Sequence, residues 1–163
     1  MHGPRPRGDH ADACDVGWRQ RYRKWAESTV TLFYFEIDDE IYYDPNLRLN
    51  RNYDDTTQRT GVELAAKLNL LEPVFLWGNF TYTWARFKDT DHDIPLVPKY
   101  SANFGLEWRV FEPLSVAFLG TFVGEKYDGS DIDNETFAKI DAYQVFDLKA
   151  TYTWKRLKVF GGI

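Results

Sequence analysis

The run 88–93 is the part of the sequence that comes nearest to a metal-ion site. It reads Lys-Asp-Thr-Asp-His-Asp, and divalent cations accept carboxylate and imidazole ligands. The run lacks the glycine and the distal glutamate of a calcium-binding EF-hand loop. The acidic segment 127–137, which begins Tyr-Asp-Gly-Ser-Asp, receives the same interpretation. We expect two solvated loops, with weak calcium or ligand contact as the alternative, and we assign no metal ligand and no cofactor.

The residues that catalyse reactions in other proteins are scattered here. His2 and His10 lie near the N-terminus and His92 lies far from both. No Ser/His/Asp or Cys/His set stands out, and Cys14 is the one cysteine, which excludes an internal disulfide framework. The sequence therefore predicts a protein that is not an enzyme.

The overall composition combines polarity with many aromatic residues. The 163 residues carry a formal net charge of −5, a mean hydropathy of −0.50 and 17% aromatic residues. The negative charge disfavours a nucleic-acid partner, because phosphate binding requires a basic surface. No stretch approaches the ~20 apolar residues of a membrane helix.

The elements that position these residues are predicted by an alternation with period two. In 99–110, Lys-Tyr-Ser-Ala-Asn-Phe-Gly-Leu-Glu-Trp-Arg-Val, every even position is apolar or aromatic and the odd positions are polar or small. Successive residues of a strand face opposite sides of a sheet, so one face is apolar. We expect about eight strands from this pattern. They span 14–22, 26–43, 57–71, 74–88, 99–111, 114–126, 143–154 and 157–163.

The connections between these strands alternate in length. Short turns are expected at 23–25, Glu72-Pro73, Glu112-Pro113 and 155–156, and long polar loops at 44–56, 89–98 and 127–142. Proline removes a backbone donor, which a turn tolerates. The two Glu-Pro pairs therefore mark a repeated unit of strand, long loop, strand and tight turn.

Periodicity alone does not decide which face meets solvent. A soluble ligand-binding β-barrel hides its apolar face inside, whereas an outer-membrane barrel turns that face toward lipid. Long strands, short turns at one end with long loops at the other, and aromatic residues near both strand ends favour the membrane barrel. These aromatic residues are Trp108 and Trp154 near short turns, and Tyr82, Trp84 and Tyr100 near long loops. Trp77 falls on the polar face, and we place it near the short-turn rim.

Four segments, taken in order, resemble the barrel of TonB-dependent receptors. Residues 52–64 contain Arg59-Thr60-Gly61-Val62-Glu63, which is similar to the family's Asn…Arg-x-Gly-Val-Glu strand. Residues 32–44 resemble the preceding strand and its exit loop. Residues 78–87, Gly-Asn-Phe-Thr-Tyr-Thr-Trp-Ala-Arg-Phe, are similar to the family's Gly-Asn-Tyr-Thr-Tyr…Ala-Arg-Phe, and 94–100 resemble its Ile-Pro…Pro strand entry.

The resemblance implies an all-β, antiparallel, up-and-down transmembrane segment of a barrel of about 22 strands in the bacterial outer membrane. We expect 1–13 to be a disordered or non-native tail, and 14–163 to be an internal piece of the barrel without plug domain or signal peptide. The implied function is uptake of ferric siderophores or similar large nutrients, energised by TonB through a plug domain, both outside this chain. Outer-membrane lipid is a further expected partner. A soluble ligand-binding barrel and a small closed outer-membrane barrel are the alternatives.

The resemblance also assigns roles to two sets of residues. Aromatic and arginine side chains in the loops suit planar, anionic ferric chelates, so the substrate-contact candidates are Tyr42, Tyr43, Arg51, Tyr53 and Tyr127. Charged and amide residues of the polar face are expected to face the lumen or the plug. They are Arg59, Glu63, Lys67, Asn103, Glu107, Arg109, Asp147 and Lys149. The basic residues at 19–24 are interpreted as a periplasmic turn with flanking lumen-facing charges.

Overall fold

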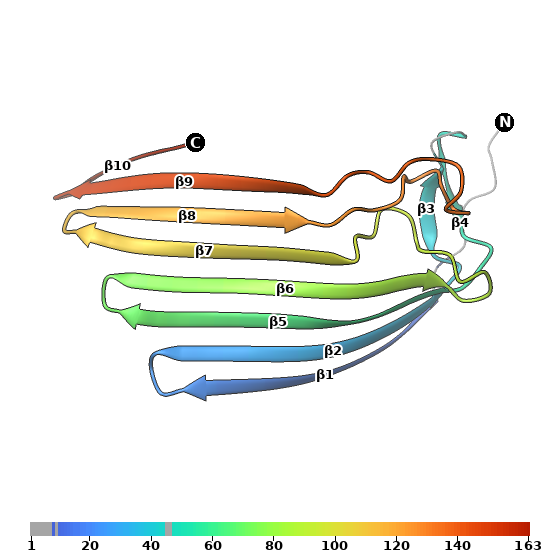
Figure 1. Ribbon diagram of the computed structural model, residues 1–163, viewed down its shortest axis with the longest axis horizontal. Helices are drawn as coiled ribbons and strands as arrows, with labels where there is room; N and C mark the ends of the chain where they lie inside the picture. Colours follow the sequence, from blue (N-terminus) through green and yellow to red (C-terminus); the bar gives the residue numbers. More distant parts are fainter. Residues whose placement is uncertain (1–7, 9, 45–46) are drawn as a thin grey trace.

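The computed structural model describes residue 8 and residues 10–44 and 47–163, and it contains one large antiparallel sheet with a small second sheet (Figure 1). The large sheet has 8 strands in the order β1-β2-β5-β6-β7-β8-β9-β10. Their bounds are β1 His10–Tyr22, β2 Ala26–Asp38, β5 Thr57–Leu71, β6 Val74–Phe87, β7 Tyr100–Phe111, β8 Leu114–Val123, β9 Tyr143–Trp154 and β10 Leu157–Gly162. The small sheet pairs β3 Ile41–Asp44 with β4 Leu49–Asn52.

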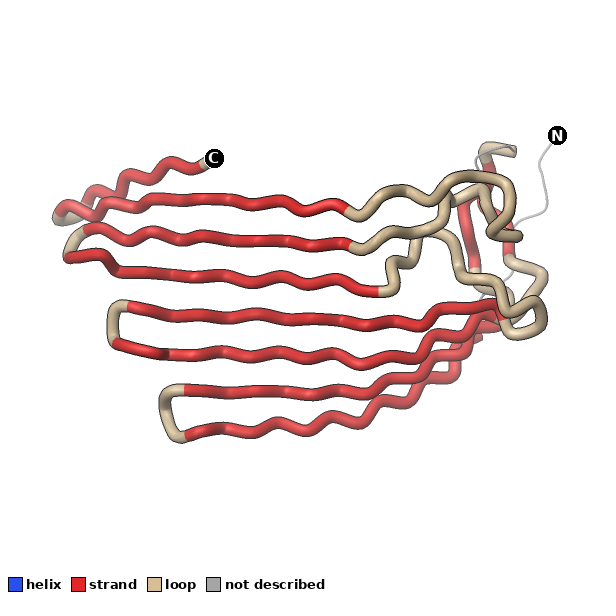
Figure 2. Tube along the Cα trace, viewed as in Figure 1, coloured by secondary structure: helices blue, strands red, loops and turns tan. Residues whose placement is uncertain are grey.

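The up-and-down connectivity expected from the sequence is confirmed. Each strand of the large sheet pairs with its sequence neighbour in that sheet, and the tight turns gather at one end while the long loops gather at the other (Figure 2). Among the described residues β1 and β10 each have a single strand partner, so the sheet is open. The small closed barrel is therefore not the structure of this segment.

The predicted strand 26–43 was wrong in one respect. β2 ends at Asp38 because Asp39 has a positive φ of 55°, which a continuous strand does not accept. The chain resumes as β3 and pairs with β4, a strand that lies inside the loop expected at 44–56. At the other end, β1 begins at His10 and pairs it with Asp38, four residues before the expected start at 14. The rest of the expected tail, 1–7 and 9, lies outside the described residues.

The two Glu-Pro turns have the same hydrogen bonding. A register shift precedes each turn, between Asn69 and Leu71 and between Arg109 and Phe111. The carbonyl of Pro73 accepts a bond from the N–H of Arg109 at 2.7 Å, and that of Pro113 accepts one from Thr153 at 3.0 Å. Each proline thus lacks a donor but still links its hairpin to the next strand. The repeat in the sequence is a repeat of this hairpin.

The strand register places the apolar residues of neighbouring strands on one face. Phe104 pairs with Gly78 and Gly120, and Leu106 pairs with Leu76 and Phe118. We call this the apolar face and the opposite one the polar face. Large side chains on the apolar face are left open: Trp108 is 46% exposed, for example.

The loops fold over the polar face. Ala85 and Phe87, on the polar face near the loop end of β6, are buried together with the loop residue Ile94, and Tyr53 and Val97 pack against them. Among the described residues, this is the cluster of buried hydrophobic side chains that contact one another. A soluble barrel would instead bury the apolar face in a central core. The loops cover the polar face and leave the apolar face exposed, which is the orientation expected for a membrane barrel.

Trp77 lies on the polar face, as its position in the alternation predicted. It pairs with Gly105 on β7, and its indole ring occupies the space where a Cβ on Gly105 would stand. Glycine here leaves room for the ring beside the neighbouring backbone. The large side chain on the polar face is thus accommodated by a residue without a side chain on the next strand.

Among the described residues, no helix has the length and the apolar character needed to cross a membrane.

Candidate functional site

The candidate site is built from the three long connections at the loop end of the sheet. They comprise 39–56, which includes the β3–β4 hairpin, 88–99 and 124–142. The carboxylate of Asp55 in the first connection accepts bonds from the N–H groups of Asp89 and Thr90 in the second, at 3.1–3.2 Å. The N–H of Leu96 in the second donates to the carbonyl of Tyr127 in the third at 3.0 Å. The connections therefore form one linked surface.

An aromatic cluster, Tyr42, Tyr53 and Phe87, forms the centre of this surface. The rings of Tyr42 and Tyr53 stack with centroids 4.2 Å apart and planes 2° apart, and Tyr53 meets Phe87 edge-on at 4.8 Å. Burial, with a further contribution from the Glu40 carboxylate, raises the pKa of Tyr53 to about 12. Burial also raises the pKa of Tyr42. Both phenols are therefore neutral at physiological pH and keep their hydroxyl protons.

Two cavities share this aromatic wall. The first has a volume of about 420 Å³ and lies between the aromatic cluster and residues such as Asp55, His92 and Thr136. The second, about 450 Å³, is bounded by Tyr43, Leu96 and Asp128 as well as by Tyr42 and Tyr53. Cavities of this size, lined by rings and a few polar groups, are typical of small-molecule sites.

A partly buried ion pair supports the base of the aromatic cluster. Arg59 on β5 donates from both Nη atoms to Glu40, at 2.9 Å to Oε2 and 2.7 Å to Oε1. Thr57, which is fully buried, donates its hydroxyl to the same carboxylate. The N–H of Tyr53 bonds to the carbonyl of Glu40 at 2.9 Å. A bidentate arginine–carboxylate pair fixes orientation, so this pair fixes the connection that carries Tyr53 to the sheet.

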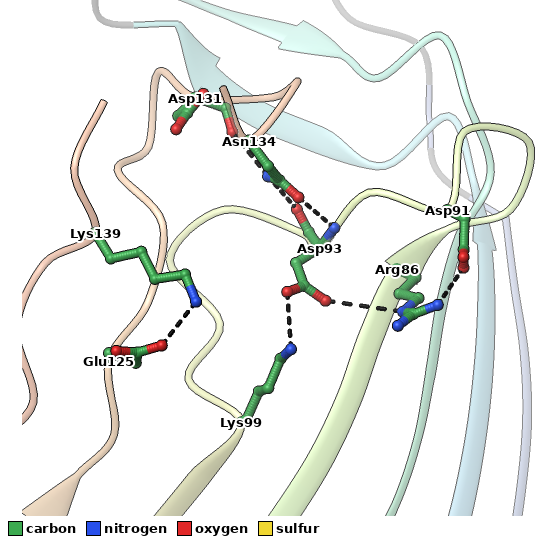
Figure 3. Close-up of polar contacts among 8 residues, drawn as sticks. All are labelled: Arg86, Asp91, Asp93, Lys99, Glu125, Asp131, Asn134 and Lys139. Atoms are coloured by element: carbon green, nitrogen blue, oxygen red, sulfur yellow. Dashed lines mark hydrogen bonds and ion pairs between the residues drawn. The ribbon is translucent and has the colours of Figure 1, made fainter. Parts of the chain in front are cut away.

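Asp93 joins the second connection to the third and to β6 (Figure 3). Its carboxylate lies 3.0 Å from Nζ of Lys99 and 3.8 Å from Nε of Arg86. Its backbone is held by Asn134, whose Oδ1 accepts from the Asp93 N–H at 2.6 Å and whose Nδ2 donates to the Asp93 carbonyl at 2.9 Å. Arg86 also pairs with Asp91. Backbone and side chain of Asp93 are thus both engaged.

The third connection has an internal carboxylate support. Asp131 is fully buried, and its oxygens accept bonds from the N–H groups of Glu135, Thr136 and Phe137 at 3.0–3.3 Å. Nearby, a bond from the backbone N–H of Ser130 lowers the pKa of Asp128. These bonds engage the carboxylates of Asp128 and Asp131 within the loop itself.

Comparison with protein families gives a match over nearly the whole chain. The family model described as "TonB dependent receptor-like, beta-barrel" matches residues 10–163. The chain belongs to the TonB-dependent receptor family. Receptors of this family reside in the bacterial outer membrane and are transporters rather than enzymes. The soluble ligand-binding barrel is therefore not the correct alternative.

Relatives of known name and structure agree with this assignment. The chain is 36% identical over 107 residues to the "Ferrichrome outer membrane transporter/phage receptor" of Escherichia coli K12. The copper transporter OprC superimposes with a TM-score of 0.74 at 19% identity over 96% of this chain. The ferric enterobactin receptor PfeA of Pseudomonas aeruginosa gives 0.74 at 19% identity over 94%, and the ferric-catecholate receptor Fiu of E. coli K12 gives 0.70 at 21% over 91%. These structures show the fold.

The matched part is a small share of each relative. The chain spans 14% of the length of the ferrichrome transporter and 25%, 25% and 22% of the OprC, PfeA and Fiu chains. The described sheet is therefore one segment of a receptor barrel, which agrees with its two open edges.

Of the loop residues predicted to contact substrate in this receptor segment, three line the two cavities. They are Tyr42, Tyr43 and Tyr53. Arg51 does not line either cavity, because it pairs with Asp44 across the β3–β4 hairpin at 3.6 Å. Tyr127 lies beneath the ammonium of Lys139 at 4.8 Å, beside a much smaller cavity.

The residues predicted to face the receptor lumen or plug all lie on the polar face. Three of them also make side-chain contacts there. Arg59 turns to Glu40 in the connection above it. Asn103 donates to Asn79 at 3.1 Å and accepts from the hydroxyl of Thr121 at 2.9 Å, which makes a polar ladder across three strands. Lys149 lies over the ring of Phe160 at 4.9 Å. The remaining residues share the polar face through strand register: Glu63, Lys67, Glu107, Arg109 and Asp147.

Sequence reasoning missed several residues of the site. Glu40, Phe87 and Asn134 were not candidates, although each holds the loops together. Their partners lie 19 to 41 positions away in the chain, so no local pattern marks them. The acidic run at 88–93 was expected to be a solvated loop, with weak calcium or ligand contact as the alternative; the structure pairs Asp91 with Arg86 and Asp93 with Lys99. No group of acidic, histidine or cysteine side chains in the described part of the chain is arranged to hold a metal ion.

Proposed function

We propose that this chain is an arc of a barrel of about 22 strands that imports a ferric siderophore across the outer membrane. TonB supplies the energy by acting on a plug domain, and both lie outside this segment. The polar face looks onto the plug and the lumen, and the apolar face contacts lipid. The three connections contribute part of the external ligand site.

The observation that carries the proposal is the pair of cavities around Tyr42 and Tyr53 at the loop end of the segment. In a receptor barrel the long loops face outward from the cell and the short turns face the periplasm. A ligand arriving from outside therefore meets the aromatic cluster first. The names of several relatives refer to ferrichrome, ferric enterobactin and ferric catecholates, which supports an iron chelate as the cargo.

The experiment is iron uptake by cells that lack the receptor gene. Complementation with the intact receptor should restore growth under iron limitation and accumulation of a radioactive ferric siderophore. Tyr53→Ala should lower the apparent affinity about tenfold or more, because the stacked ring and its cavity wall are lost. Thr153→Ser, at the opposite end of the sheet, serves as the control variant.

Two results would contradict the proposal. One is unchanged iron accumulation in the deletion strain for every ferric siderophore tried. The other is full uptake by Tyr53→Ala, which would show that this surface does not contact the cargo.

A further inference from the structure

The walls of the two cavities have a pronounced charge bias. Asp54, Asp55 and Asp133 line the first cavity and Asp128 lines the second. Among the described residues that line either cavity there is no lysine and no arginine, and His92 is the one basic group. Hydrogen bonding with Asp131 and with the N–H of Glu135 lowers the pKa of Asp133, so this carboxylate stays ionised near neutral pH.

Three cations of the surrounding loops are paired with carboxylates that do not line the cavities. Arg51 pairs with Asp44, Arg59 pairs with Glu40, and Lys139 pairs with Glu125 at 2.7 Å. Each of these positive charges is matched by a carboxylate outside the cavities. The cavity walls that this segment contributes therefore carry negative charge, with neutral phenols and rings as the apolar contacts.

The polar groups in the walls are mainly hydrogen-bond acceptors or hydroxyls. The first cavity offers carboxylates together with the hydroxyls of Thr90 and Thr136, and Ser130 borders both cavities. Such walls suit a ligand that presents N–H or O–H donors and an uncharged or positive surface. An anionic ligand would lose its hydration and meet like charges.

We propose that the cargo recognised here is an iron chelate with zero or positive net charge, such as a ferric trihydroxamate, and not an anionic tricatecholate. This inference rests on the proposed function. Three hydroxamates, each a monoanion, cancel the charge of ferric iron, whereas three catecholate dianions leave the complex strongly negative. The expectation that aromatic and arginine side chains select anionic chelates is replaced, because Arg51, the arginine among the candidates, lines neither cavity.

The test measures binding of two size-matched probes to the intact receptor in detergent. One probe is a neutral ferric trihydroxamate and the other a ferric tricatecholate, and the quenching of receptor tryptophan fluorescence reports binding. The wild-type receptor should bind the trihydroxamate about tenfold tighter or more, as expected for an unfavourable interaction between like charges in a partly desolvated site.

Charge variants assign the preference to these walls. Asp54→Lys places a positive charge in the exposed wall of the first cavity, and Asp89→Lys makes the same change in a neighbouring exposed turn that lines neither cavity. Asp54→Lys should shift the ratio of the two affinities toward the tricatecholate by about tenfold, and Asp89→Lys should shift it by less than about threefold. Asp54→Asn should shift it in the same direction by a smaller factor.

The outcomes separate the two proposals. Tighter binding of the tricatecholate by the wild type, or equal shifts from Asp54→Lys and Asp89→Lys, overturns the charge preference and leaves the receptor function intact. Binding of neither probe, combined with normal iron uptake in the deletion strain, overturns both.

Discussion

Asn134 binds both backbone polar groups of Asp93, a residue 41 positions earlier in the chain. Its side-chain oxygen accepts the Asp93 N–H at 2.6 Å and its side-chain nitrogen donates to the Asp93 carbonyl at 2.9 Å. The same nitrogen donates to the carbonyl of Asp131 at 3.2 Å. One amide therefore fastens the second connection to the third (Figure 3).

Removing this amide should loosen the loops without unfolding the sheet. Asn134 has a positive φ of 61°, which glycine accepts, so Asn134→Gly deletes the bonds without adding strain. The loss of these three bonds should cost about 1–3 kcal/mol of local stability. Hydrogen exchange at the amides of Asp93, Ile94 and Leu96 should accelerate accordingly, while exchange in β7 stays unchanged. Asn134→Asp keeps the acceptor and should give an intermediate effect; equal exchange in all three proteins would show that the bonds are not formed.

The Arg59–Glu40 pair should matter more than the exposed pairs at the loop surface. The side chains of Arg59 and Glu40 are 19% and 21% exposed, and Glu40→Gln leaves a partly buried guanidinium without its counter-charge. We expect a loss of about 1–3 kcal/mol in loop stability. Glu125→Gln, which breaks the exposed pair with Lys139, should cost less than about 1 kcal/mol. The loop stability of both variants is measured in detergent by heating each protein and detecting the opening of the loops by their cleavage with a protease. Equal losses would contradict the structural role of the Arg59–Glu40 pair.

Alkaline titration should reveal Tyr53 as a late-ionising phenol. Its pKa is raised from 10.0 to about 12, so the folded loops hold this proton more tightly than the unfolded chain does. The resulting contribution to stability is complete below pH 10 and is lost as the pH rises toward 12. The difference in phenolate absorbance between the wild type and Tyr53→Phe should therefore appear near pH 12. A midpoint near pH 10 would mean that Tyr53 is open to solvent.

The sequence predicted the large sheet well because strand alternation is a local signal. Residues 99–110 alternate between apolar and polar types, and β7 has the faces that this alternation predicts. The Glu-Pro pairs marked their turns for an equally local reason, since proline lacks an N–H.

The loop architecture could not be predicted in the same way. Asp39 ends β2 through a positive φ, yet the residues around it continue to mix polar and apolar types as a strand does. The β3–β4 hairpin and the contacts of Glu40 and Asn134 depend on partners that only the folded sheet brings near. The orientation of Arg51 is also set by its partner Asp44 across this hairpin. Aromatic residues were therefore better guides to the cavities than arginine was.

The orientation of the sheet in the membrane is tested most directly by comparing labels at Leu106 and Glu107. These neighbours lie on opposite faces of β7, and a Cys14→Ser background removes the native thiol. Leu106→Cys and Glu107→Cys, each carrying a nitroxide label in the intact receptor in lipid vesicles, are exposed in turn to oxygen, which partitions into lipid, and to a water-soluble nickel chelate. The account predicts that the Leu106 label collides mainly with oxygen. For the Glu107 label, the ratio of nickel-chelate collisions to oxygen collisions should be higher. The reverse pattern would contradict it.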